Sequence, residues 1–294
     1  MILKLKPIFI DKIWGGRLLK ELFHYETSDQ CGECWGISAH PSASNVVDHP
    51  LFKDVTLRTL YETHPELFGH YPAEEFPILV KLIHAQEDLS IQVHPDDRYA
   101  ERFKSYGKEE CWTILNAQEE ASLYMGHSFN TPEALLESLH QGTFMSNIKI
   151  QHVKPGDFYY IPTGTLHAIG AGIVLLEVQQ SSDLTFRIFD YHRLENGQPR
   201  TLHLDDALAV MHFPDKPILR APQDTFFDYQ LNTFNEPTSK TAHLHGDYVF
   251  VMEGEGHLNE TPVKKGDFLM VSSLHPYEVK GSLTLQTTQI VKKH

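Results

Sequence analysis

V-K-P-G-D-F at residues 153–158 recurs near the C-terminus as V-K-K-G-D-F at residues 263–268. In both places an apolar, strand-like run follows the hexapeptide, and a Leu-His pair follows that run (residues 166–167 and 274–275). A Gly-Asp step suits a tight turn between antiparallel strands. A shared turn with a shared downstream pair therefore predicts two copies of one β-barrel.

Working outward from these two turns, most of the chain has the pattern of short strands. The candidates are rich in β-branched and aromatic residues and are separated by Gly, Pro, Asp and Asn. They cover residues 76–83, 89–93, 111–115, 122–125, 148–153, 158–161, 173–178, 184–189, 248–252, 268–271 and 283–287. Many short strands at this spacing are typical of a sandwich or jelly-roll barrel, so we predict an all-β fold.

Only a few short helices are expected. Thr131 is a good N-cap, Pro132 suits the first helical position, and Gly142 is a stop signal. Two further helices are predicted over residues 56–62 and 204–210. Prolines cluster over residues 213–222, and this cluster marks the junction between the two barrels.

The composition limits the classes of function. The chain has 294 residues, 41% of them hydrophobic, which is enough for one large core or two smaller ones. A formal net charge of −14 disfavours nucleic acid and anionic membrane as partners, because both need a basic surface. An anionic metabolite would need its own cluster of Lys and Arg.

The expected cellular compartment is indicated by two kinds of segment that the sequence lacks. No apolar run is long enough to span a bilayer, and the N-terminus has no signal-peptide core, so a cytoplasmic protein is expected. Three cysteines fit a reducing compartment. Two of them form a C-x-x-C over residues 31–34, which we interpret as coincidental because no second pair exists.

Polar residues alternate along one predicted strand, S-I-Q-V-H at residues 90–94. Alternate side chains of a strand share a face, so Ser90, Gln92 and His94 point one way and the two apolar residues point the other. Convergent polar groups inside a barrel favour a binding site. A polar face on an exposed edge strand explains the pattern equally well.

Two further residues could complete a metal site. Glu110 precedes an apolar strand, and His167 follows the rigid turn I-P-T-G-T-L at residues 161–166. Two neutral imidazoles and a carboxylate, with a position left open, form the pattern of catalytic zinc and support Lewis-acid chemistry on hydroxyls and carbonyls. The amide oxygen of Gln92 would be a weaker fourth ligand.

Two basic residues accompany these candidates. Lys108 lies two residues before Glu110 and shares its face if the segment is extended, although a charged turn is the commoner fate of a Lys-Glu-Glu run. Arg187 lies within an apolar strand, so its side chain faces either solvent or a polar cavity. Its planar donors suit a phosphate or a polarised sugar oxygen.

Four blocks carry a resemblance to a known family. They are L-S-I-Q-V-H-P-D-D (89–97), G-K-E-E-C-W (107–112), I-P-T-G-T-L-H-A-I-G (161–170) and E-V-Q-Q-S-S-D-L-T-F-R-I-F-D-Y (177–191). In this order they resemble the signature segments of the type I mannose-6-phosphate isomerases, in their short bacterial form. The resemblance implies a double cupin fold of jelly-roll barrels, a zinc cofactor, and interconversion of mannose 6-phosphate and fructose 6-phosphate through a cis-enediol.

The resemblance also implies roles for individual residues. By motif position, the metal ligands are His94, Glu110, His167 and, less firmly, Gln92, the catalytic residue is Arg187, and Ser90 and Lys108 bind the substrate phosphate. Short bacterial members are usually described with only the two histidines and the glutamate as ligands. The general base stays open between Glu177, Asp183 and a metal-bound water.

These inferences divide the chain into two domains. We expect one Zn²⁺ per chain in a catalytic cupin domain over residues 1–215, and a smaller, metal-free, cupin-like domain over residues 216–294. In the second domain His243, His245, Asp247 and His275 could imitate a ligand set, but Pro-x-Gly is missing before the last of them.

The expected partner is a small sugar phosphate, with neither nucleic acid nor membrane, and the oligomeric state is left open. Two alternatives remain at this point. One is a cupin oxygenase that uses Fe(II) on the same triad, and the other is a non-catalytic sugar-phosphate sensor.

Overall fold

The computed structural model describes residues 1–216 and 226–291. Their contacts group the chain into two compact units. Unit 1 comprises Met1–Phe9, Cys34–Lys81 and Gln223–His294, and unit 2 comprises Ile10–Glu33 and Leu82–Pro222. Both units are built mainly from strands, so the prediction of an all-β fold with a few short helices is confirmed.

Unit 1 contains an eight-stranded sheet. Its main path is β18 (Phe227–Phe234), β23 (Pro276–Ile290), β20 (Asp247–Leu258), β22 (Phe268–Val271), β1 (Ile2–Leu5) and β6 (Val47–Asp48). Off this path, β19 (Thr238–Thr241) pairs with β23 and β21 (Thr261–Lys264) pairs with β20, while β4 (Ala39–His40) and β5 (Ala43–Ser44) pair with each other. Aliphatic side chains such as Val249, Leu269 and Leu285 form its buried core.

The N-terminal strand explains why the units do not follow the chain order. β1 runs antiparallel to β22, with Ile2 opposite Val271 and Leu5 opposite Phe268. The segment that begins the chain therefore belongs to the same sheet as its C-terminal part. The expected division of roles between residues 1–215 and 216–294 stays a prediction.

Unit 2 carries the candidate site on two sheets. One has the order β11 (Ile148–His152), β10 (Ser122–His127), β13 (His167–Ile169), β8 (Ile91–Val93) and β15 (Phe186–Phe189). The other has the order β12 (Phe158–Ile161), β9 (Glu110–Ala117), β14 (Ile173–Gln180), β7 (Ile78–Ala85), β3 (Cys31–Ile37) and β2 (Ile8–Asp11). Its first three strands belong to unit 2, whereas β7, β3 and β2 each have residues in both units. A separate small pair joins β16 (Leu194–Glu195) to β17 (Gln198–Pro199).

The helices are short. They are α1 (Leu18–Phe23), α2 (Leu57–Thr63), α3 (Asp97–Ala100), α4 (Pro132–His140) and α5 (Leu204–Val210), with 3-10 turns at Pro50–Phe52, Pro65–Phe68, Glu101–Phe103 and Phe144–Asn147. The three predicted helices are confirmed to within a residue or two at their ends. Thr131 caps α4 by accepting a hydrogen bond from the backbone N of Ala134 at 3.3 Å. Within the described residues, no helix is long and apolar enough to cross a membrane.

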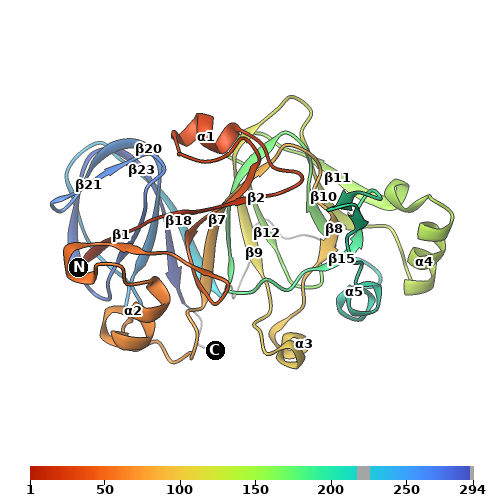
Figure 1. Ribbon diagram of the computed structural model, residues 1–294, viewed down its shortest axis with the longest axis horizontal. Coiled ribbons are helices and arrows are strands. Elements are labelled where there is room, and N and C mark those ends of the chain that lie inside the picture. Colours follow the sequence, from red (N-terminus) through yellow and green to blue (C-terminus); the bar gives the residue numbers. More distant parts are fainter. Residues whose placement is uncertain (217–225, 292–294) are drawn as a thin grey trace. The chain divides into compact units, whose positions relative to one another are not determined.

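The alternation predicted for residues 90–94 is confirmed. Ile91 and Val93 are fully buried in an apolar layer that also contains Leu135 of α4 and Ala207 of α5. In Figure 1, α4 and α5 lie on the side of β8 and β15 away from β9 and β12. The polar residues of β8 therefore face the interior of the barrel, where the site lies.

The repeated hexapeptide builds the same turn in both units. The backbone N of Lys154 donates to Asp157 Oδ2 at 2.9 Å, and that of Lys264 donates to Asp267 Oδ2 at 2.9 Å. The glycines between them have φ of +91° and +93°, a left-handed conformation that favours glycine. The repeat is thus structural. The copies diverge afterwards, since Leu166 is buried and Leu274 is exposed.

Candidate active site

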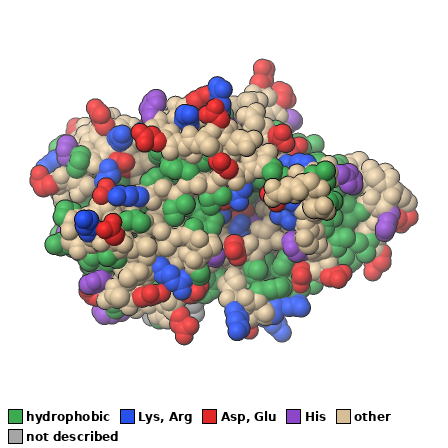
Figure 2. Space-filling model, in the orientation of Figure 1, with side chains coloured by type: hydrophobic (Ala, Val, Ile, Leu, Met, Phe, Trp, Pro, Cys, Tyr) green, Lys and Arg blue, Asp and Glu red, His purple; other side chains and the backbone are tan. Residues whose placement is uncertain are grey.

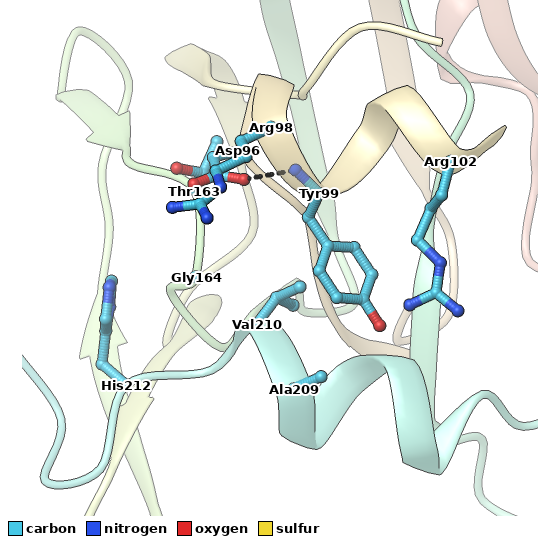
Figure 3. A pocket seen from close by; sticks show the side chains of 9 residues that line it. All are labelled: Asp96, Arg98, Tyr99, Arg102, Thr163, Gly164, Ala209, Val210 and His212. Atoms are coloured by element: carbon cyan, nitrogen blue, oxygen red, sulfur yellow. Dashed lines mark hydrogen bonds between the residues drawn. The ribbon is translucent and has the colours of Figure 1, made fainter. Parts of the chain in front are cut away.

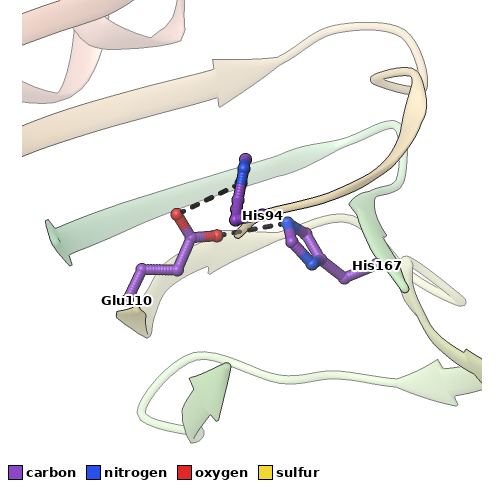
Figure 4. Close-up of side chains that lie close together, drawn as sticks. All are labelled: His94, Glu110 and His167. Carbon is purple, nitrogen blue, oxygen red and sulfur yellow. Dashed lines mark ion pairs between the residues drawn. The ribbon is translucent and has the colours of Figure 1, made fainter. Parts of the chain in front are cut away.

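Three buried side chains converge inside unit 2 (Figure 4). His94 follows β8, Glu110 begins β9 and His167 begins β13, so the two sheets contribute to one site. Glu110 Oε2 lies 3.7 Å from His94 Nε2, and Glu110 Oε1 lies 3.3 Å from His167 Nε2. The potential ligand atoms all lie within 4.8 Å of one another, which is the compactness that a single metal ion requires.

The backbone fixes the orientation of both imidazole rings. His94 Nδ1 is 2.8 Å from the carbonyl oxygen of Leu184, and His167 Nδ1 is 2.9 Å from that of Thr165. A carbonyl only accepts hydrogen bonds, so each Nδ1 carries the proton and each Nε2 presents a lone pair. This is the arrangement in which histidine binds metals.

His167 provides the test of whether a cation fits. Its Nε2 is buried and makes no hydrogen bond with the described residues, although Glu110 lies beside it. Burial lowers the pKa of His167 to about 4, so the ring is neutral at physiological pH. A buried, neutral nitrogen that faces a carboxylate suits a divalent cation.

Lys108 lies against the same triad. Its Nζ is 2.9 Å from Glu110 Oε2 and 3.1 Å from His94 Nε2. Burial alone would lower the pKa of Lys108, but the charges of Glu110 and Glu177 outweigh it and raise the pKa. The ammonium group is therefore charged and lies within reach of anything bound at the triad.

The remaining predicted residues meet on β8 and β15. Gln92 is opposite His167 on β13 and opposite Arg187 on β15. Arg187 Nε donates to Ser90 Oγ at 3.2 Å, and Ser90 Oγ lies 3.5 Å from Gln92 Oε1. The structure thus brings Ser90, Gln92 and Arg187 together. They lie next to the triad, because Gln92 is opposite His167 in the pairing of β8 with β13.

Sequence reasoning missed a cluster of arginines beside Arg187. Asp190 is buried and accepts hydrogen bonds from Arg193 at 2.5 Å and from Arg200 at 2.7 and 2.6 Å. Burial, followed by the charge of Arg200, lowers the pKa of Arg187, and the charge of Arg193 acts in the same direction. Asp190 and Glu195 are the acids that act on Arg187, so three arginines face two carboxylates there.

The two candidate bases differ in burial. Glu177 on β14 is buried, and its Oε2 accepts a hydrogen bond from Trp112 Nε1 at 3.1 Å. Its charge also contributes to the pKa of Lys108 and of His167. Asp183 is exposed. The structure therefore places Glu177, and not Asp183, in the buried surroundings of the triad.

In the second barrel, Asp247, one of the residues that could imitate a metal ligand, is occupied by hydrogen bonds within the protein. Asp247 is buried, and its carboxylate accepts hydrogen bonds from the backbone N of His243 (3.0 Å), from Gln289 Nε2 (2.7 Å) and from Tyr277 OH (2.8 Å). Over residues 1–216 and 226–291, His94, Glu110 and His167 are the one such group with ligand atoms this close. Cys31 and Cys34 are buried, and no disulfide joins them.

The fold and the site together define a barrel protein with a buried candidate metal centre and an arginine cluster beside it. The sequence model described as phosphomannose isomerase type I, catalytic domain, matches residues 2–127. The mannose-6-phosphate isomerase ManA of Bacillus subtilis is 36% identical over 94% of this chain and 95% of its own. The enzyme of that name from Streptococcus mutans is 34% identical over 95% and 97%. The chain belongs to the type I mannose-6-phosphate isomerase family.

Solved structures agree with this assignment. The mannose 6-phosphate isomerase of Bacillus subtilis superposes with a TM-score of 0.93 at 36% identity, covering 98% of this chain and 99% of that one. A phosphomannose isomerase variant from Salmonella typhimurium, at 18% identity and a TM-score of 0.78, shares the fold. The predicted cupin fold is thereby confirmed.

Proposed function

We propose that this chain interconverts mannose 6-phosphate and fructose 6-phosphate with one zinc ion bound by His94, Glu110 and His167. The observation that carries the proposal is the buried triad, whose two imidazoles are fixed with Nε2 facing one carboxylate. Family membership and the neighbouring arginines add support for an isomerase of phosphorylated sugars.

The donor set suits zinc. Two imidazole nitrogens and one carboxylate, with an open position, are characteristic of catalytic zinc sites. We propose Gln92 as a further, neutral ligand, because its strand position lies opposite His167. When bound, the metal supplies Lewis-acid polarisation of the sugar oxygens at the reacting carbons.

The proton transfer between C1 and C2, through a cis-enediol, needs a base close to the triad. We propose Glu177, since it is buried and Trp112 holds its carboxylate in one orientation. Lys108 is positioned to donate a hydrogen bond to a sugar oxygen bound at the triad, which is how we propose it binds substrate.

The substrate phosphate needs positive charge in a chain whose net charge is −14. We propose that Ser90 and Arg187 bind the substrate on the side of the arginine cluster, and that Arg187 also stabilises negative charge that develops on oxygen. Arg193 and Arg200, held by Asp190, reinforce the local positive potential.

A coupled assay of mannose 6-phosphate conversion tests the function directly. Zinc-loaded protein should turn over, and chelator-treated protein should not until zinc is restored. Turnover by neither preparation would favour the sugar-phosphate sensor. Iron in protein purified without added metal, together with oxygen consumption, would favour the Fe(II) oxygenase.

Arg187→Ala tests the role of one residue. Because the guanidinium contacts the proposed substrate position and none of the triad, turnover should fall about 100-fold or more while bound zinc is unchanged. Exposed Arg17 offers the matched control, and Arg17→Ala should alter neither quantity. Loss of zinc from Arg187→Ala would mean that Arg187 supports the fold of the metal site.

A further inference from the structure

A side chain completes one edge of the sheet that contains β8 and β15. β15 is the last strand of this sheet, and its Arg187 lies opposite Gln92 of β8. On the outer side of β15, the backbone N of His203 donates to the carbonyl oxygen of Arg187 at 2.8 Å. The backbone N of Arg187 in turn donates to Nδ1 of the His203 ring at 3.2 Å. The ring therefore accepts the hydrogen bond that the carbonyl of a neighbouring strand would otherwise accept.

The same segment also fixes the guanidinium group of Arg187. Nη1 donates to the carbonyl oxygen of Thr201 at 2.8 Å, and Nε donates to Ser90 Oγ at 3.2 Å. Two hydrogen bonds from different nitrogens fix the plane of the group. Nη2 makes no hydrogen bond with residues 1–216 and 226–291, so its donors are left for a substrate oxygen.

The chemistry of the His203 ring suits its contact with the backbone. A backbone N–H only donates, so Nδ1 of His203 is unprotonated and the proton of the neutral ring lies on Nε2. Burial, followed by the charge of Arg187, lowers the pKa of His203, which keeps the ring neutral at physiological pH. The ring also lies beside that of Phe186, with centroids 6.3 Å apart.

Helix α5 determines where the ring lies, because the helix begins directly after His203. Ala207 of α5 packs in the same buried layer as Phe186 of β15. Figure 3 shows the ring of Tyr99 extending from α3 toward α5, and its hydroxyl donates to Asp206 Oδ1 at 2.9 Å. His203 is thus presented to Arg187 by a helix that is packed and hydrogen-bonded to its neighbours.

We propose that His203 is a positioning residue for the isomerase reaction, because it holds the backbone of Arg187 where the guanidinium group meets the substrate oxygens. The inference rests on the proposed function, in which Arg187 binds substrate and stabilises negative charge on oxygen. The pairing of β15 with β8 is irregular between Arg187 and Phe189, so the ladder alone holds this part of the strand less firmly. A displacement of about 1 Å at a catalytic group can lower a rate about 100-fold.

Two substitutions separate the hydrogen bond of His203 from the bulk of its ring. His203→Leu removes the acceptor, whereas His203→Asn restores one, because the amide oxygen of asparagine lies close to where Nδ1 was. In zinc-loaded protein, His203→Leu should lower kcat roughly tenfold with bound zinc unchanged, and His203→Asn should recover most of that loss.

A matched control comes from the surface histidines. The chain has 19 histidines, and Figure 2 shows several of them at the surface. His140, at the end of α4, is exposed. His140→Leu makes the same change of residue type away from Arg187 and should match the parent in kcat.

Nuclear magnetic resonance tests the contact without any turnover. In protein labelled with ¹⁵N at histidine and arginine, Nδ1 of His203 should have the chemical shift of an unprotonated nitrogen. The Nε–H of Arg187 should exchange slowly with water, since it is bonded to Ser90. His203→Leu should speed this exchange several-fold, while His203→Asn and His140→Leu should stay near the parent rate.

The outcomes distinguish failure of this inference from failure of the proposed function. A zinc-loaded parent without turnover would refute the proposed function, whatever the exchange at Arg187 shows. An active parent that His203→Leu matches in kcat or in exchange would overturn the positioning role alone. Equal impairment of His203→Asn and His203→Leu would overturn it as well, since the bulk of the ring would then be the cause. A protonated Nδ1 in the parent would refute the contact even if His203→Leu failed to fold.

Discussion

Lys108 places a buried positive charge against two of the three proposed metal ligands. Its Nζ contacts Glu110 Oε2 at 2.9 Å and His94 Nε2 at 3.1 Å, so it opposes the binding of a second cation there. We expect Lys108→Met to bind zinc roughly tenfold more tightly and to lose about 100-fold in turnover. Chelator-buffered zinc titration and the coupled assay measure the two effects.

The exposed Lys104 provides the control for that substitution, since Lys104→Met removes a lysine from the same region without touching the triad. Zinc affinity and turnover should both stay at the parent level. Weaker zinc binding by Lys108→Met would show instead that Lys108 holds the ligands in place.

Asp190 joins two arginines at the edge of the proposed substrate site. Burial alone would raise the pKa of Asp190, but the hydrogen bonds from Arg200 and Arg193 outweigh it, so its pKa lies below the usual range. A depressed pKa means that the stabilisation is present above the unfolded-state pKa, about 3.9, and is lost as the pH falls through the folded-state pKa. Asp190→Asn should therefore lower the free energy of unfolding by about 2 kcal/mol at pH 6.

The same pair of proteins tests the sign of this effect. Denaturation curves of the parent and Asp190→Asn should start to converge as the pH falls below the unfolded-state pKa, about 3.9, and should meet only below the depressed folded-state pKa of Asp190, where the folded aspartate also becomes neutral. Asp29, in an exposed pair with Lys20, gives the matched control, and Asp29→Asn should change stability by less than about 0.5 kcal/mol. A difference at pH 6 that persists undiminished in acid would mean that charge is not the cause.

Among the elements, sequence patterns predicted those features of the fold that depend only on residues close together in the chain. The alternation in residues 90–94 placed the polar side chains inside the barrel, because side-chain direction in a strand depends only on the period of two. β1 was missed because its partner β22 lies at the other end of the chain. The three-residue β13 gave too little signal, whereas β18 was not predicted although its residues alternate between apolar and polar over Phe227–Asn232.

The arginine cluster escaped prediction for a similar reason. Arg193 reaches Asp190 through a turn in which Tyr191 and His192 both have positive φ (53° and 58°). Non-glycine residues seldom adopt this conformation, so the residue types in the segment do not predict the turn. The metal triad could be predicted from the sequence because the resemblance to a known family indicated its positions. Residue spacing alone had left these positions open.

The turn before β13 is the element that joins the two histidines proposed as metal ligands. The backbone N of Gly164 donates to the carbonyl of His94 at 2.9 Å, and Thr165 fixes the ring of His167. Gly164 has φ of +76°, and a Cβ there would lie 2.7 Å from the carbonyl oxygen of Val210. Gly164→Ala should cost about 2 kcal/mol of stability and weaken zinc binding, measured by denaturation and zinc titration.

The control variant Gly142→Ala separates backbone strain from steric contact as the cause of the effects predicted for Gly164→Ala. Gly142 has a similar φ of +70°, but a Cβ there would meet nothing within 4 Å. Gly142→Ala should cost about 1 kcal/mol through backbone strain alone and should leave zinc binding unchanged. Equal zinc affinity in Gly164→Ala and the parent would show that the turn does not position the ligands.

For the whole molecule, the two units differ in what they use their buried polar groups for. Unit 2 directs two histidines and a glutamate toward one point, whereas unit 1 satisfies Asp247 with hydrogen bonds from a backbone amide, Gln289 and Tyr277. The repeated turn shows that both barrels share a construction. The proposed metal would therefore distinguish two barrels that share this turn, and its removal should destabilise unit 2 alone.

Hydrogen exchange of zinc-loaded and chelated protein tests that asymmetry. A ligand present at about 100 times its dissociation constant stabilises the state that binds it by about 2.7 kcal/mol. Because His94 and His167 flank β8 and β13, the amides of these strands should exchange faster once zinc is removed, by up to about 100-fold. The amides of β20 and β22 in unit 1 should be unchanged, since no proposed ligand lies there. Equal acceleration in β20 and β22 would contradict a single metal site in unit 2, because the zinc would then stabilise both barrels.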